Sequence, residues 1–326
     1  PAGREVGRQG YAPQPGGAVA MVTYVKVLKP TPITDAMFIG SAVTEAEHAL
    51  WSDVITYAID EWVIYNHRIC QSLAGSNLNH LPDEVGGTWW NDYGPTNQWA
   101  AFDNKVGTTS NLVTSGGNPT WWTRVAPGVC NGVYIMGMSG VASVRVQMFN
   151  GATSVFDETA TLDDTVIGDA YQYYFEPFDI RTDLLFGPLP PYYGAQVLVT
   201  LTPAVVGDTI KVGGVQFGNT VEIGLMRYGI GVDFKDYSIK ELDEFKQATL
   251  VERDFSTLPK YLLYVERSQI RRVFSTITAL RATPCVWIAS DDYQLTPFNV
   301  YGFPRTFSLV LPWYAGSYFD LGIEGM

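Results

Sequence analysis

The sequence is poor in charged residues and contains no long apolar run. Charged residues make up 17% of the chain and the net charge is −12. A nucleic-acid backbone is bound by a basic stripe, so we expect no nucleic-acid partner. No run of about 18 apolar residues exists to cross a bilayer, so we expect no membrane span. The first residues lack the charged and then apolar pattern of a secretory signal, which favours a protein made in a cytoplasm.

Residue types that often act in catalysis or metal binding are also scarce. The sequence has three widely separated cysteines, Cys70, Cys130 and Cys285. Their odd number and wide spacing favour free buried thiols over a disulfide framework. The three histidines are His48, His67 and His80. None of them has the i, i+4 spacing of a helical metal-ligand pair, so we interpret them as polar loop residues. No Gly-x-Ser-x-Gly nucleophile elbow is present.

Acidic pairs are the remaining candidates for catalysis. They are Asp157-Glu158, Asp163-Asp164 and Asp291-Asp292. A glycosidase needs two carboxyl groups about 5–10 Å apart across a sugar cleft. Neighbouring acids in a turn mostly face solvent, although Asp163 and Asp164 leave a loop-bound Ca²⁺ as an alternative. The sequence therefore predicts no enzyme, no metal site and no cofactor.

Turn residues and aromatics are abundant instead. Gly and Pro number 32 and 19, and aromatics reach 13%. Asn150-Gly151 is a strong hairpin signal, and residues 196–202 alternate between apolar and polar. Short strands recur about every 10 residues through this part of the chain. We therefore predict a mainly β protein whose residues 107–225 form a β-sandwich resembling a jelly roll.

The C-terminal residues 226–326 differ in character. Apolar residues recur at helical spacing over 268–281, at Ile270, Val273, Phe274, Ile277 and Leu280. Apolar strands are expected at 286–288 and 301–311. This pattern predicts a β-rich domain with one amphipathic helix.

Aromatic residues concentrate between Trp51 and Phe102. A hairpin is predicted over 62–70, with its turn at Asn66-His67. We expect Trp51, Tyr57, Val63 and Tyr65 to form the small core of a module spanning residues 44–106. Neighbouring strand residues point to opposite sides, so Trp62 and Val63 cannot both face that core. The candidate ligand or interface residues are Trp62, Trp89, Trp90, Tyr93 and Trp99.

The segments that flank the module carry weaker signals. Residues 1–43 are predicted to be an extended arm followed by a strand at 19–28. Thr44-Glu45-Ala46-Glu47 has the spacing of a capping box, which predicts a short helix ending near Leu50. The Ser/Thr/Gly/Asn stretch 107–118 is expected to be a linker or broad loop.

Two family resemblances accompany these patterns. The spacing of Trp51, Tyr57, Val63 and Tyr65 resembles the small chitin-binding modules of bacterial chitinases, but Cys70 stands where an aromatic is expected. Several tracts are similar to a family of bacteriophage tail and virion proteins: residues 63–68, 94–99, 102–107, 174–177 and 281–284. The second resemblance implies a carbohydrate-binding-like module inserted ahead of a β-sandwich, and a C-terminal domain like that of tail tubes and distal-tail rings.

The function that this resemblance implies is structural. We expect a virion protein of a phage tail, collar or baseplate, assembled in the host cytoplasm. Its partners would be other copies of itself and other tail, baseplate or fibre proteins. One alternative is a receptor-recognition protein whose module binds a host surface glycan. Another is a glycan-degrading tail enzyme with two carboxylates at the aromatic surface.

Overall fold

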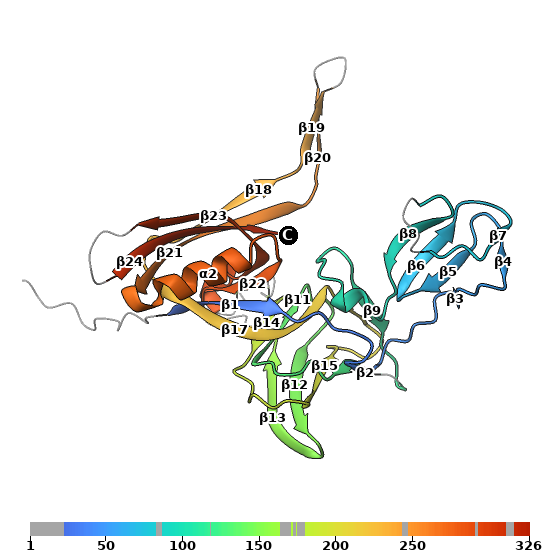
Figure 1. Cartoon of the computed structure of the whole chain (residues 1–326), viewed down its shortest axis with the longest axis horizontal. Helices are drawn as coiled ribbons and strands as arrows, with labels where there is room; N and C mark the ends of the chain where they lie inside the picture. The colour runs from blue at the N-terminus through green and yellow to red at the C-terminus, as the bar shows by residue number, and fades with distance from the viewer. Residues whose placement is uncertain are drawn as a thin grey trace, which may run out of the picture.

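The computed structural model of the chain is mainly β, with several sheets (Figure 1). It describes residues 23–82, 87–117, 119–163, 171, 174, 180–242, 247–290, 293–310 and 316–326. The expected N-terminal arm over residues 1–17 and the 174–177 tract lie wholly or largely outside these ranges. No helix of the described residues is long and apolar enough to cross a membrane.

A nine-stranded sheet forms the centre of the molecule, in the order β14-β11-β17-β1-β22-β23-β24-β21-β18. Its strands are β1 (Tyr24–Pro30), β11 (Gly132–Met136), β14 (Leu184–Phe186), β17 (Gly214–Met226), β18 (Gly231–Asp236), β21 (Phe255–Glu266), β22 (Cys285–Ile288), β23 (Val300–Val310) and β24 (Gly316–Gly325). An additional pairing joins β17 to β21. Six of the strands, from β17 through β1 to β21, therefore form a closed hydrogen-bonded circuit.

Helix α2 (Ile270–Ala279) covers the apolar face inside this circuit. It follows the 3₁₀ turn η2 (Arg267–Gln269). Its buried residues Val273 and Ile277 belong to one core cluster with Tyr261, Trp287 and Phe319 of the surrounding strands. The helix predicted at 268–281 is therefore confirmed, because its apolar stripe has a curved sheet to pack against.

A second sheet packs against the other end of the central sheet. It has the order β13-β12-β15-β10-β2. Its strands are β2 (Phe38–Ser41), β10 (Trp121–Val125), β12 (Ser143–Asn150), β13 (Thr153–Thr161) and β15 (Gln196–Thr202). Val146, Val197 and Trp121 of this sheet share a core with Val133 and Phe217 of the central sheet. The sandwich character expected from the alternating strands is present.

Several local predictions are confirmed. The Asn-Gly hairpin joins β12 to β13, and Gly151 has the positive φ of 62° that its turn requires. The strand predicted at 196–202 is β15. The apolar strands expected at 286–288 and 301–311 are β22 and β23, and the 3₁₀ turn η3 (Tyr293–Phe298) lies between them.

Two local predictions are wrong. Residues 44–48 are not helical, and the short strand β3 (Ala49–Leu50) follows them. The capping-box residues Glu45 and Glu47 bond instead to groups more than twenty residues away, namely His67 and the Asn97 N–H. The stretch 107–118 is also more than a linker, because β9 (Ser110–Val113) pairs within it to β16 (Thr209–Val212).

Strands of one sheet come from different segments of the division that the sequence suggested. β1, from the first expected segment, pairs with β17 and β22. β2 pairs with β10 in the sandwich. We therefore use the term body for the described parts of residues 24–43 and 107–326, and module for the described residues of 44–106.

A two-stranded arm projects from the body (Figure 1). It consists of β19 (Ile239–Leu242) and β20 (Ala248–Val251), which pair only with each other. β18 and the first half of β21 form its base. We use the term arm for the described residues of 231–258.

Candidate functional site

The module is a small sheet that closes around aromatic residues. Its four strands have the order β3-β5-β6-β8, with β5 (Trp62–Tyr65), β6 (Arg68–Ser72) and β8 (Trp90–Pro95). A second pair joins β4 (Thr56–Tyr57) to β7 (Asn77–Leu78). Tyr57, Val63, Cys70 and Trp90 are its buried core, against which Trp51 and Trp89 pack. Tyr57 and Val63 thus occupy the core positions that the sequence predicted for them.

The predicted hairpin of the module is present. β5 and β6 pair antiparallel, with Tyr65 opposite Arg68. Asn66 and His67 form the turn, with φ angles of 45° and 61°. Two consecutive residues with positive φ match the twist of the strands in a type I′ turn, and asparagine tolerates this conformation.

Two of the candidate site residues meet on the exposed face of this sheet. The ring centroids of Trp62 and Tyr93 are 4.4 Å apart. His48 stacks on Trp62 with centroids 5.6 Å apart and planes 18° apart. The Tyr93 side chain is 61% exposed, whereas Trp62 is half-buried. We call these three residues the aromatic row.

A β-bulge brings Tyr93 to this position. The pairing of β6 with β8 shifts between Ile69, which lies opposite Gly94, and Cys70, which lies opposite Asp92. Tyr93 is therefore the extra residue on β8, and a bulge re-aims the side chain that it carries. Tyr93 was a candidate from the sequence, but only the register reveals its contact with Trp62. His48 was missed, because a loop histidine gives no local signal of stacking.

The other three candidates lie elsewhere. Trp90 is only 4% exposed and donates its indole N–H to the His80 carbonyl at 2.8 Å, so it fills the core and offers no ring face to a ligand. Trp89 is half-buried and stacks on His80 at 3.9 Å. Trp99 lies at the start of the 3₁₀ turn η1 (Ala100–Phe102) and stacks on His67 at 4.1 Å.

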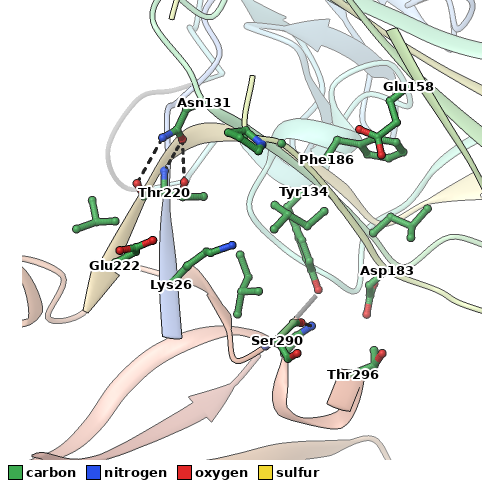
Figure 2. A pocket seen from close by; sticks show the side chains of 18 of the residues that line it. Lys26, Asn131, Tyr134, Glu158, Asp183, Phe186, Thr220, Glu222, Ser290 and Thr296 are labelled. Atoms are coloured by element: carbon green, nitrogen blue, oxygen red, sulfur yellow. Dashed lines mark hydrogen bonds between the residues drawn. The ribbon is translucent and has the colours of Figure 1, made fainter. Parts of the chain in front are cut away.

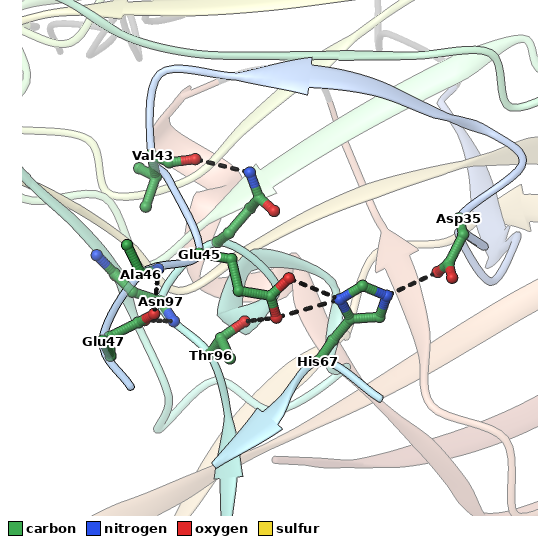
Figure 3. A network of polar contacts seen from close by, with 9 residues as sticks. Asp35, Val43, Glu45, Ala46, Glu47, His67, Thr96 and Asn97 are labelled. Atoms are coloured by element: carbon green, nitrogen blue, oxygen red, sulfur yellow. Dashed lines mark hydrogen bonds and ion pairs between the residues drawn. The ribbon is translucent and has the colours of Figure 1, made fainter. Parts of the chain in front are cut away.

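A polar network joins the module to the body (Figure 3). His67 lies between Glu45, 3.0 Å from Nδ1, and Asp35, 2.9 Å from Nε2. Thr96 donates its hydroxyl to Glu45, and Gln98 donates its amide to the Val43 carbonyl. Trp99 also packs against Phe38, at the start of β2 in the body. Ala101 and Phe102 also pack into the core of the body, so polar, aromatic and apolar contacts together hold the module against the body.

The body contains a cavity of about 750 Å³ beside the central sheet (Figure 2). Lys26, Tyr134, Asp183 and Glu222 are among the residues that line it. Burial raises the pKa of Asp183, although the Gly137 N–H and the Thr182 hydroxyl partly oppose this. Burial also raises the pKa of Tyr134, with a further contribution from Asp183. A raised carboxyl pKa in a cavity can mark a catalytic site, but Asp183 accepts the Gly137 N–H at 2.9 Å, which gives it a structural role.

Most of the cysteines and acidic residues that the sequence offered for chemistry are buried, paired or outside the described residues. Cys70, Cys130 and Cys285 are free and buried, as predicted. Burial raises the pKa of Cys130 to about 11 and that of Cys285 to about 12, so both thiols are protonated and unreactive at neutral pH. Asp157 is bound by Arg145, with a 2.6 Å contact between Nη2 and Oδ2. Asp164, Asp291 and Asp292 lie outside the described residues.

The arm presents a second candidate surface. Apolar and aromatic side chains along it are exposed in the single chain: Phe234 71%, Phe255 58%, Leu250 71%, Tyr237 41%, Ile239 38% and Val251 37%. Phe234 and Phe255 contact each other edge to face, with centroids 6.4 Å apart. A two-stranded ribbon has no interior in which to bury such residues.

The fold and these surfaces define a β-rich protein with a compact body, a separate aromatic module and a projecting arm. No family model, no curated protein and no solved structure matches the chain.

Proposed function

We propose that the protein is a homo-oligomeric structural protein of a bacteriophage virion, in the tail, collar or baseplate. In this role the arm packs on a neighbouring subunit, and the module projects toward a fibre, another tail protein or the host envelope. The single observation that carries the proposal is the row of exposed apolar residues on the arm. Exposed aromatic and aliphatic side chains at this density favour a protein partner.

The charge and composition of the chain also support an assembly role. A net charge of −12 with only 17% charged residues leaves large weakly charged surfaces for contact between copies. Symmetric assembly lets one arm and one complementary surface be reused around a ring. The resemblance of several tracts to phage tail and virion proteins supports a place for this oligomer in a virion.

The test compares the oligomeric state of the full chain with that of an arm variant. Phe234→Asp together with Leu250→Lys places charges on the arm without touching a buried residue. The matched control is Val205→Lys, which changes a side chain that is 63% exposed in a turn of the body. We expect the wild type and the control to form a discrete oligomer by light scattering after size-exclusion chromatography, and the arm variant to be monomeric.

A monomeric wild type over the micromolar range would overturn the assembly proposal. If the arm variant still forms the same oligomer as the wild type, the interface between subunits lies on another surface. Mass spectrometry of purified virions then tests the phage setting, since a virion protein is recovered with the particles through repeated density-gradient purification.

Glycan binding by the module is the second candidate function. The observation that favours it is the aromatic row, in which Tyr93 keeps 61% of its surface exposed beside Trp62. Sugar rings stack on such faces through their C–H groups. Trp62 is half-buried, because His48 and Tyr93 both contact its ring. The row therefore fits one or two sugar units rather than a long chain.

Co-sedimentation with extracted envelope polysaccharide tests this function. Tyr93→Ala and Trp62→Ala should abolish saturable binding, whereas Tyr193→Ala should retain it, because Tyr193 is an 88% exposed tyrosine of the body. Absence of binding by the wild type would leave the module as an assembly surface. Release of reducing ends during the assay would favour the glycan-degrading alternative.

A further inference from the structure

His67 has an unusual position at the junction between the module and the body (Figure 3). It is the second turn residue of the β5–β6 hairpin, and its carbonyl accepts the Thr96 N–H at 2.8 Å. Its ring is stacked on Trp99, which fixes the plane of the imidazole. One ring nitrogen faces Glu45 and the other faces Asp35. The side chain therefore bridges three separate segments of the chain.

The chemistry of the two partners determines the charge of the ring. An ionised carboxylate only accepts hydrogen bonds. Both ring nitrogens lie within 3.0 Å of a carboxylate oxygen, so both must donate for the two bonds to exist. Only the imidazolium form carries a proton on both nitrogens. A neutral ring would direct one lone pair at a carboxylate and lose that bond.

The two carboxylates differ in how firmly they are held. The Glu45 side chain is 17% exposed and also accepts the Thr96 hydroxyl at 2.9 Å. The Asp35 side chain is 77% exposed and lies in the turn before β2. A neutral ring would thus keep its single proton toward Glu45, inside the module junction, and release Asp35 of the body.

The other charged groups near this ring are engaged elsewhere. Arg68, the next residue of the hairpin, is paired with Asp92 of β8 at 2.6 Å. Glu47 accepts the Asn97 N–H at 2.6 Å. The segment after β8 contributes the neutral Thr96 and Trp99 to the junction. Asp35 and Glu45 are therefore the charged groups that contact the His67 ring.

We propose that His67 is a proton-dependent latch that fixes the module against the body. With both nitrogens protonated, the ring holds Glu45 and Asp35 together and the module has one orientation. Loss of one proton releases Asp35, and the module then moves about its connections to the body. The doubly protonated ring closes the latch and the singly protonated ring opens it. The latch therefore sets the orientation of the aromatic row relative to the body, whichever partner the row binds.

The orientation of the module can be measured by single-molecule energy transfer. One dye is attached at Ser76→Cys in the module and the other at Thr153→Cys in the hairpin of the sandwich, both exposed sites. The native thiols are buried and do not react under native conditions. We expect a narrow distance distribution at pH 5.5 and a distribution at least twice as broad at pH 8.5.

Three variants separate the latch from a purely structural histidine. His67→Gln removes the charge and should give the broad distribution at both pH values. His80→Gln changes a histidine stacked on Trp89 within the module and should behave as the wild type. Asp35→Asn is the sharpest test, because its amide can donate to the neutral ring. This variant should keep the narrow distribution at pH 8.5.

Nitrogen-15 spectra of the imidazole rings report the charge of His67 directly, and the three histidines are assigned by substitution. Both His67 nitrogens should be protonated at pH 5.5. Circular dichroism shows whether each variant is folded, so that an unfolded module is not counted as an open latch. A neutral His67 ring at pH 5.5, or a wild-type distance distribution that is the same at both pH values, would overturn the proposal.

Discussion

The core of the body is large and mainly aliphatic, whereas the core of the module is small and mainly aromatic. The body buries long rows of Val, Leu and Ile from two packed sheets, with a minority of large aromatics such as Trp121, Trp287 and Phe319 among them. The module buries Tyr57, Val63, Cys70 and Trp90, and gains partly buried Trp51 and Trp89 around them. A module of about 50 residues cannot build a thick layer of aliphatic side chains, so a few large aromatic rings fill its interior.

The histidines are also distributed unevenly between the body and the module. All three lie in or beside the module, and each one stacks on a tryptophan: His48 on Trp62, His67 on Trp99 and His80 on Trp89. The body depends on apolar area, whereas the module depends on a small number of specific ring and polar contacts. A single substitution should therefore have a more local and more complete effect in the module than in the body.

Trp287→Ala tests the body and should have the largest effect on the whole chain. Trp287 is fully buried, and its indole N–H donates to the Gly302 carbonyl at 3.0 Å. Truncation leaves a cavity and an unpaired carbonyl, and we expect a loss of about 3–5 kcal/mol in the free energy of unfolding. Urea unfolding measures this loss. Phe274→Ala on the half-exposed side of α2 is the control and should cost far less. Equal losses for the two variants would contradict our account of the core.

Trp90→Ala is the corresponding change in the module. The side chain is only 4% exposed, so the cost is again about 3–5 kcal/mol. The module has few other buried residues, and we expect it to unfold while the body stays folded. Hydrogen exchange should show lost protection confined to residues 51–95. Tyr93→Ala, on the exposed side of the same strand, should keep the protection. Loss of protection throughout the body would mean that the two regions unfold as one unit.

Asp183→Asn should change how the stability of the body depends on pH. Burial raises the pKa of Asp183 in the folded chain. The folded state therefore binds this proton more tightly than the unfolded state, and stability falls as pH rises from about 4 through the folded pKa. Asparagine has no such proton, and its carbonyl can still accept the Gly137 N–H. Thermal unfolding should show the variant more stable than the wild type at pH 7, with the difference shrinking toward pH 3. A difference that does not vary with pH would rule out this titration.

Arg145→Gln should have the smallest effect. The guanidinium hydrogen bond from Arg145 lowers the pKa of Asp157, with a further bond from Gln147. A lowered pKa in the folded state stabilises the protein above about pH 4, and the benefit is lost as pH falls through the folded pKa. This pair lies on the solvent side of the β12–β13 hairpin, so we expect only a slight drop in melting temperature at pH 7 and none near pH 2. High salt should shrink the drop further.

Elements with a strong local pattern were the ones that sequence predicted well. The apolar stripe of α2, the alternation of β15 and the Asn150-Gly151 turn all lie within about fifteen residues of chain. The apparent capping box at 44–47 failed for the opposite reason. Its local spacing matched a helix, but distant partners bind its two glutamates.

The candidate site was predicted only in part. The sequence indicated Trp62 and Tyr93 as surface aromatics, and the alternation of strand residues separated Trp62 from the buried Val63. It did not distinguish Trp89 from Trp90, of which only Trp90 is buried in the core. Nor did it predict the junction role of Trp99, because that role depends on the positions of Phe38 and His67.

Sequence patterns were enough to predict that the chain is mainly β, that its C-terminal region carries an amphipathic helix and that aromatics concentrate in a small module. Periodicity and turn chemistry are local properties and can be read from neighbouring residues. The tertiary structure decided that β1 lies between β17 and β22, that a bulge turns Tyr93 onto Trp62 and that His67 lies between two carboxylates. These contacts join residues that are far apart in the chain, and they exist only because packing brings their strands and turns together.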